Sequence, residues 1–215
     1  RGNLADEIRR FKPAGGALPS VILVTDSVRL PDPRVAVRKL APGSAVILRH
    51  YDHPERAALA RDLAEICRQR RIKLLIAGDW RLAVAVGAAG VHLPERMTRR
   101  GPIAWGASAA KKPEFLVTAA AHSRAAIERA ARSGCDAVLL SPVFQTASHP
   151  GAKALGPLRF ALWCRNSRVP IYALGGIDAK TARRLKDSGF AGIAAIGALA
   201  GVPTTLKPAK LNFTA

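Results

Sequence analysis

Two glycine-containing turns are the residues of this chain best suited to holding a phosphate group. Gly175-Gly176 ends one apolar run, and Ile196-Gly197 ends the next. Glycine leaves its backbone N–H accessible, and successive N–H groups in a turn form a concavity that binds anions. Asp178 can cap a helix that begins directly after the first turn. The sequence therefore predicts a phosphate site at Gly175, Gly176, Ile196 and Gly197.

Other polar residues follow or interrupt the remaining apolar runs. Arg49 suits bidentate binding of a phosphate or diphosphate, and a salt bridge to Asp26 or Asp79 is an equally good interpretation. His122 lies just beyond an apolar run, where an imidazole can transfer protons. Both Arg49 and His122 are candidate catalytic residues. His92 lies within an apolar run, and this placement favours a buried structural histidine.

The segment Pro142–Pro157 is a long polar loop that follows directly after Ser141. Loops of this length in compact domains often carry function. We expect Ser141, Thr146 and Ser148 to bind substrate and His149 to take part in catalysis.

A regular alternation of short apolar strands and helical segments must position these residues. Nearly continuous apolar runs are typical of parallel strands buried on both faces. Eight such strands predict an α/β fold, a single-domain (β/α)8 TIM barrel with its chemistry at the carboxyl ends of the strands. An open doubly wound sheet is the alternative, but no GxGxxG follows the first strand. The expected strands are Val21–Thr25, Ala45–Arg49, Lys73–Ala77, Val91–Leu93, Phe115–Ala119, Asp136–Ser141, Val169–Leu174 and Ala191–Ile196.

The barrel domain is expected over residues 21–201, after an N-terminal extension (1–20) and before a C-terminal tail (202–215). The segment Glu95–Glu114 has little periodicity, and we assign it to mixed helix and loop. A helix is expected over Asp178–Ser188, and Gly197-Ala198 is expected to form a turn.

The composition is that of a basic α/β protein. The formal net charge is +19, from 34 Lys and Arg against 15 Asp and Glu. These basic residues are spread along the chain without an RNP motif, zinc finger or helix-turn-helix. A surface that steers phosphorylated small molecules is therefore favoured over specific nucleic-acid binding. No apolar run reaches the ~20 residues of a membrane span. Three scattered cysteines favour reduced thiols and a cytoplasmic location, while association into a homo-oligomer stays open.

Four segments resemble the thiamine phosphate synthases and their relatives, the thiazole tautomerases. They are AVAVGAAGVHL (Ala83–Leu93), TAAAHS (Thr118–Ser123), SPVFQTASHPGAKALG (Ser141–Gly156) and YALGGI (Tyr172–Ile177). The resemblance is collinear over about residues 20–200. It implies a (β/α)8 barrel and a reaction that joins a hydroxymethylpyrimidine diphosphate to a thiazole phosphate. That reaction releases diphosphate with the help of Mg2+.

The resemblance carries over best at the phosphate site. Gly175 and Gly176 match the family's glycines, and the Ile-Ser pair of the eighth strand reads Ile196-Gly197. Of the Gln-x-Arg-x-Lys pattern after the second strand, only Arg49 remains.

The family's other polar positions are substituted. The Thr-x-Thr-Lys run after the sixth strand reads Thr146-Ala147-Ser148-His149, so histidine replaces lysine. The serine of the fifth strand becomes Ala120. The histidine of the tautomerases falls on Pro142.

The magnesium ligands that the resemblance implies are displaced. The aspartate after the third strand falls on Gly78, with Asp79 one position later. The second carboxylate falls near Arg96-Met97, with Glu95 close by. Since Mg2+ requires near-octahedral oxygen ligands, Asp79 and Glu95 are the candidate ligands and a Mg2+ cofactor is in doubt.

The leading interpretation is a thiamine phosphate synthase-like transferase of thiamine biosynthesis. It would bind a phosphorylated thiazole or similar heterocycle and couple it to a pyrimidine diphosphate. The alternative is a catalytically degenerate homologue that binds a phosphorylated ligand or has a regulatory role. The displaced carboxylates and the replaced lysine favour this alternative. A nucleic-acid-binding role follows from the charge alone.

Overall fold

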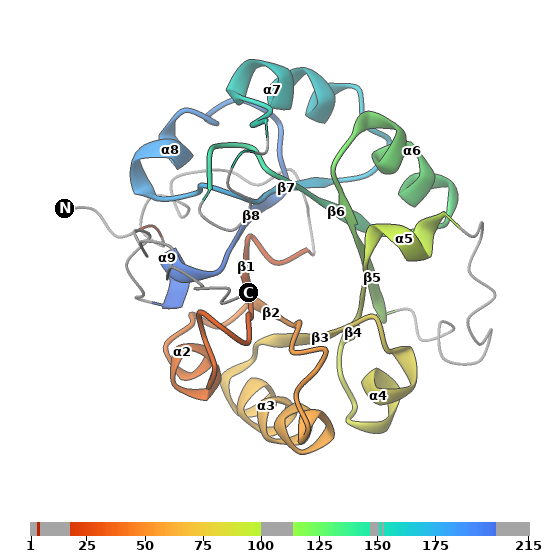
Figure 1. The fold of residues 1–215 in the computed structure, drawn as a ribbon, viewed down its shortest axis with the longest axis vertical. Helices are drawn as coiled ribbons and strands as arrows, with labels where there is room; N and C mark the ends of the chain where they lie inside the picture. Colours follow the sequence, from red (N-terminus) through yellow and green to blue (C-terminus); the bar gives the residue numbers. More distant parts are fainter. Residues whose placement is uncertain (1–3, 5–17, 100–113, 147–150, 152, 201–215) are drawn as a thin grey trace, which may run out of the picture.

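In the computed structural model, eight parallel strands form a closed barrel surrounded by helices (Figure 1). The structure describes residues 4, 18–99, 114–146, 151 and 153–200. Neighbouring strands in the sequence pair with one another, and β1 pairs with β8 to close the sheet. The predicted (β/α)8 TIM barrel is therefore confirmed. The strands are β1 (Val21–Val24), β2 (Ala45–Leu48), β3 (Lys73–Ala77), β4 (Gly90–Leu93), β5 (Leu116–Ala121), β6 (Ala137–Leu140), β7 (Ile171–Ala173) and β8 (Gly192–Ala195).

The helices lie outside the strands and connect them (Figure 1). The predicted cap at Asp178 is confirmed, since its Oδ1 accepts the N–H of Thr181 at 2.7 Å; Ser123 Oγ likewise accepts the N–H of Ala126 at 3.2 Å. Such caps satisfy N–H groups that have no partner within the helix. The helices are α2 (Arg34–Arg38), α3 (Arg56–Arg70), α4 (Trp80–Ala85), α5 (Glu95–Thr98), α6 (Arg124–Arg132), α7 (Pro157–Arg165), α8 (Ala179–Arg183) and α9 (Gly197–Ala200).

Alternate residues of each strand enter different parts of the core. Ile22 and Ile47 pack with Tyr172 in the cluster inside the barrel. Leu23, between two inward residues, packs instead in the cluster that includes Val37 of α2 and Leu63 of α3. Burial on both faces explains why the strands read as unbroken apolar runs.

Two predicted elements differ from the structure. The helix expected over Asp178–Ser188 is only α8, because the chain leaves the helix at Arg184. Gly197-Ala198, expected to be a turn, begins helix α9. The segment Glu95–Glu114, expected to be mixed helix and loop, begins with α5 over residues 95–98, and residues 100–113 lie outside the described part. The tail over 202–215 and most of the extension over 1–20 also lie outside it.

Two smaller expectations concern cysteines and membranes. Cys67 and Cys135 are buried free thiols, and Cys164 is half-buried. Among the described helices, none combines the length and apolarity needed to cross a bilayer.

Tyr172 supports one prediction about stability. Its buried hydroxyl donates a hydrogen bond of 2.6 Å to the carbonyl of Pro19, just before β1. The substitution Tyr172→Phe leaves that carbonyl without its partner inside the protein. We expect the free energy of unfolding, measured by urea denaturation, to fall by about 1–2 kcal/mol.

The matched control is Tyr51→Phe. The Tyr51 side chain is 42% exposed, and its hydroxyl forms no hydrogen bond within the described residues, so we expect little change. Equal unfolding free energies for Tyr172→Phe and the unmodified protein would contradict the assigned role of the Pro19 contact.

Candidate functional site

The turn after β7 is packed tightly against the loop after β6. Gly175 and Gly176 have φ angles of +91° and +65°. A Cβ atom on Gly175 would lie 2.9 Å from Pro142 Cα, and one on Gly176 would lie 2.4 Å from the Gln145 carbonyl oxygen. The N–H of Phe144 also donates to the Gly175 carbonyl at 3.0 Å. Both positions therefore require glycine for conformation and for space.

The helix that follows fixes the other side of this turn. Asp178 and Thr181 form a reciprocal capping box at the start of α8. Thr181 Oγ1 also donates to the Gly176 carbonyl at 2.8 Å. Carbonyl oxygens of the turn are thus engaged, while the N–H groups of Gly175 and Gly176 donate to no other described residue. The turn presents backbone donors suited to an anion.

Of the two phosphate-site residues predicted at the end of β8, Ile196 turns its side chain into the core. The side chain of Ile196 is 9% exposed and packs in the cluster inside the barrel, so only its backbone can reach a ligand. Gly197 is the first residue of α9. Its N–H belongs to the first turn of the helix, where N–H groups have no intrahelical acceptor.

Arg49 makes an internal salt bridge, one of the two interpretations left open by the sequence. Its Nη2 lies 3.0 Å from Asp26 Oδ2, and its Nε donates to the Thr25 carbonyl at 3.3 Å. Burial acts to raise the pKa of Asp26, but hydrogen bonds and charge from Arg29, with the charge of Arg49, outweigh it and hold that pKa below its ordinary value. The Arg49 side chain remains 29% exposed.

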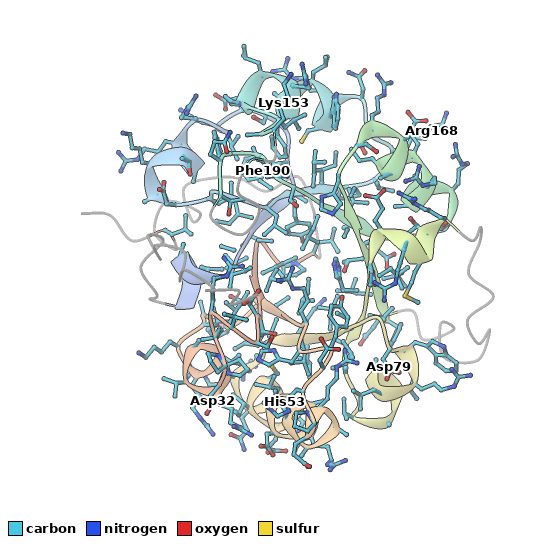
Figure 2. All side chains as sticks on the ribbon, viewed as in Figure 1. Asp32, His53, Asp79, Lys153, Arg168 and Phe190 are labelled. Atoms are coloured by element: carbon cyan, nitrogen blue, oxygen red, sulfur yellow. The ribbon has the colours of Figure 1, made fainter. Side chains whose placement is uncertain are left out.

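The two candidate magnesium ligands are both engaged elsewhere. Asp79 caps α4, accepting the N–H of Leu82 at 2.9 Å, and its other oxygen lies 4.0 Å from Arg56 (Figure 2). Glu95 accepts Arg129 Nη2 at 2.9 Å and the backbone N–H of His122 at 3.1 Å.

These pairings do not fit a Mg2+ ion held by Asp79 and Glu95. Mg2+ requires several oxygen ligands in near-octahedral geometry. Across residues 18–99 and 114–146, and in the described part beyond, no three His, Cys, Asp or Glu side chains come together as a metal site. The carboxylates act instead as a helix cap and as partners of arginines.

His122 and Ser141 come together at the ends of β5 and β6. His122 Nδ1 lies 2.9 Å from the Ser141 carbonyl oxygen and 3.4 Å from its Oγ. Because a carbonyl oxygen only accepts, Nδ1 carries a proton in this contact, and Nε2 of a neutral imidazole keeps its lone pair. The His122 side chain is exposed. It can therefore act as a base toward a ligand at this edge.

The loop after β6 is described only in part. Thr146 is half-buried at the end of the described stretch. Ser148 and His149, the other predicted residues of this loop, lie outside the described residues.

His92 is a buried structural residue, as its position in an apolar run indicated. Its Nδ1 and Thr118 Oγ1 are 2.9 Å apart. Burial, with a smaller contribution from the positive charge of Arg49, lowers the pKa of His92 to about 3. The imidazole is therefore neutral at physiological pH.

Sequence reasoning missed Arg56 as a residue of the strand ends. Arg56 Nη2 donates to the carbonyl of Ala77, the last residue of β3, at 2.5 Å. The Arg56 guanidinium lies 5.5 Å from the centre of the Tyr51 ring. For Arg56, the only signal in the sequence was its position at the start of the next helix.

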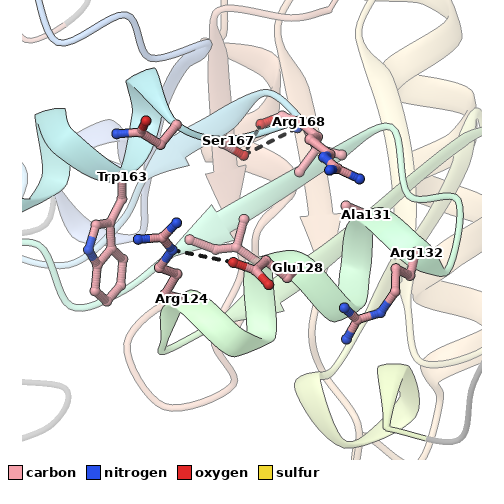
Figure 3. Close-up of a pocket in the computed structure, with 10 residues that line it drawn as sticks. Arg124, Glu128, Ala131, Arg132, Trp163, Ser167 and Arg168 are labelled. Carbon is pink, nitrogen blue, oxygen red and sulfur yellow. Dashed lines mark hydrogen bonds and ion pairs between the residues drawn. The ribbon is translucent and has the colours of Figure 1, made fainter.

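A cavity of about 450 Å3 lies on the outer flank of the barrel, away from these residues. It is formed between α6 and α7 (Figure 3), with Trp163 on one side and arginines around it. None of the predicted site residues lines it. The charged lining residues are Arg124, Glu128, Arg132 and Arg168.

Comparison with known proteins gives a consistent result. The family model described as thiamine monophosphate synthase matches residues 21–199. An Aquifex aeolicus protein, provisionally named thiamine-phosphate synthase 2, is 34% identical over 155 residues, covering 70% of this chain and 80% of the relative. The thiamine-phosphate synthase of Thiobacillus denitrificans is 32% identical over 165 residues, covering 75% of each chain.

A solved structure supports the fold. The chain resembles the thiamine phosphate pyrophosphorylase of Pyrococcus furiosus with a TM-score of 0.69 and 23% identity. The similarity covers 86% of this chain and 89% of that chain.

The buried imidazole of His92 predicts a pH dependence of stability. An unfolded histidine titrates near 6.5, whereas His92 in the folded protein titrates at about 3. Between these values the unfolded state binds a proton that the folded state does not, so stability falls as the pH falls below about 6.5. We expect the melting temperature to decrease from pH 7 to pH 4, and to decrease less in His92→Gln.

The matched control is His53→Gln, because His53 lies in the loop before α3 and not inside the barrel. Burial also lowers the pKa of His50, so part of the decrease persists in every variant. An identical decrease in His92→Gln and in the unmodified protein would refute the contribution of His92.

Proposed function

Because the chain belongs to the thiamine monophosphate synthase family, we propose that it binds a phosphorylated thiazole or a similar phosphorylated heterocycle. The phosphate lies on backbone N–H groups after β7 and β8, at Gly175, Gly176 and Gly197. The single observation that carries this proposal is the turn after β7, whose carbonyls accept hydrogen bonds while its N–H groups donate to no other described residue.

General physical chemistry supports a phosphate at this place. The loops after strands 7 and 8 and the start of a short extra helix are a frequent phosphate site in (β/α)8 barrels. Here α9 is that short helix. The net charge of +19 also favours the approach of anionic ligands.

Binding is better supported than the family's coupling reaction. That reaction expels diphosphate, whose negative charge must be neutralised as it leaves. The carboxylates of Asp79 and Glu95 are occupied by backbone N–H groups and arginines. We therefore derive no step through a Mg2+ ion at these residues, and take ligand binding as the function that the geometry supports best.

The proposal is tested at Gly176. In Gly176→Ala, the new methyl group would overlap the Gln145 carbonyl oxygen, 2.4 Å away, and disturb the turn. We expect thiazole phosphate to raise the melting temperature of the unmodified protein and to raise that of Gly176→Ala much less. Differential scanning fluorimetry at several ligand concentrations measures both shifts.

Gly189→Ala provides the control for backbone strain. Gly189 also has a positive φ, +72°, but a Cβ atom there meets nothing within 4 Å. This variant should lose stability without losing the ligand-induced shift. If the shift is absent from the unmodified protein, or unchanged in Gly176→Ala, the phosphate is not held by this turn.

A second candidate function is proton transfer within the bound heterocycle. The observation that favours it is the contact of His122 Nδ1 with the Ser141 carbonyl, which leaves Nε2 as a base. Pro142, the next residue, stands where the resemblance predicts the tautomerase histidine. His122, directly after β5, thus lies at the same corner of the barrel from the side of the neighbouring strand.

This activity is measured as incorporation of deuterium from D2O into a thiazole phosphate, followed by mass spectrometry. General acid–base catalysis contributes about 10²–10⁴-fold, so His122→Gln should slow incorporation by at least about 100-fold. His53→Gln should have no effect. Incorporation at equal rates in His122→Gln would exclude His122 as the base.

A further inference from the structure

Three arginines lie beyond the carboxyl ends of β2, β3 and β4, and the guanidinium of one of them, Arg56, lies 5.5 Å from the centre of the Tyr51 ring. Arg49 follows β2, Arg56 begins α3 and reaches the end of β3, and Arg96 lies in α5 after β4. Burial raises the pKa of Tyr51, and the positive charges of Arg49, Arg96 and Arg56 all act to lower it. The charges of all three arginines therefore act on one hydroxyl group.

Arg56 is held in place with most of its donors unused. Its Nη2 donates to the Ala77 carbonyl, and its Nη1 is 4.0 Å from Asp79, beyond hydrogen-bond distance. Its Nε is buried and has no hydrogen-bond partner among the described residues. A guanidinium has five N–H donors. Arg56 is therefore a positioned cation whose remaining Nη N–H groups, and not its buried Nε, are the donors that face a ligand.

The positive charges of this group exceed the negative ones. Asp26 is shared between Arg29 and Arg49. Asp79 is the carboxylate nearest Arg56 and also caps a helix. Arg96 is exposed and forms no ion pair within the described residues. Such a surplus attracts anions to this part of the barrel mouth.

The same place is where the resemblance puts a magnesium-binding aspartate. That position is Gly78, with φ of +71°, and a Cβ atom there would lie 3.3 Å from Cε1 of Tyr51. The Tyr51 ring closes over the glycine, and the Arg56 guanidinium lies against the ring. An aromatic ring and a guanidinium thus stand where a carboxylate and a metal ion would be.

We propose that Arg49, Arg56 and Arg96 form a metal-independent site for a diphosphate group, in which guanidinium ions replace Mg2+. Guanidinium groups bind phosphate oxygens through paired, charge-assisted hydrogen bonds and remain charged at any physiological pH. The ligand class is a diphosphate ester or inorganic pyrophosphate. This inference rests on the proposed function, because it gives the same barrel mouth a second anion site opposite the turn after β7.

The experiment is titration calorimetry of the full chain with inorganic pyrophosphate, in EDTA and again in excess Mg2+. We expect binding in EDTA that Mg2+ does not strengthen. A hydrogen bond to a charged group is lost in each variant, so Arg56→Gln and Arg96→Gln should each weaken the affinity by about tenfold or more. The matched control is Arg61→Gln, an exposed arginine of α3 that forms no ion pair within the described residues.

Several outcomes overturn the proposal. They are binding that requires Mg2+, no binding at all, and equal losses in Arg61→Gln and Arg56→Gln. Arg96 is exposed, so Arg96→Gln keeps the test valid even if Arg56→Gln fails to fold.

The Gly176→Ala variant separates this site from the proposed phosphate site. Pyrophosphate binding should survive in that variant, and its loss would place the anion on the turn after β7 and overturn the arginine site. Pyrophosphate binding without any effect of thiazole phosphate would refute the proposed function and leave the arginine site standing.

Discussion

Closure of the sheet between β1 and β8 is the constraint on which the positions of all the candidate residues depend. Val21, Ile22 and Leu23 pair with Ile193, Ala194 and Ala195, so the first and last strands lie side by side. This pairing brings the turns after β7 and β8 into the same ring as Arg49 after β2. Because all eight strands are parallel, their carboxyl ends lie at one face of the barrel. The turn after β7 and the arginines beyond β2 and β3 become parts of one barrel mouth only because the sheet is closed.

The two parts of that mouth use different chemistry. The turn after β7 offers backbone N–H groups, and its requirements are glycine at two positions and close packing against the loop after β6. At the ends of β2 to β4 the polar groups belong to side chains, and these residues can be substituted without disturbing the strands. This difference explains how the chain keeps the glycines of its family while the family's carboxylate positions hold other residues.

Much of the fold was predictable from the sequence, because strands buried on both faces leave a clear apolar pattern. Less of the site was predictable. Whether Arg49 bound a ligand or Asp26 could not be decided, since both interpretations place the same charge at the same strand end. Arg56 was missed because its side chain extends from a helix to the end of β3, and such contacts leave no periodic signal. Gly197 was taken as a turn because a four-residue segment, Gly-Ala-Leu-Ala, carries too little pattern to mark a helix.

The contact between Tyr172 and Pro19 has a consequence for the order of folding. The two residues are 153 positions apart in the chain, and their hydrogen bond joins the approach to β1 with the interior face of β7. Contacts of such long range form late, because most of the intervening chain must first be ordered. Until β8 is made and packed, β1 can pair only with β2, and its other edge keeps unpaired backbone groups.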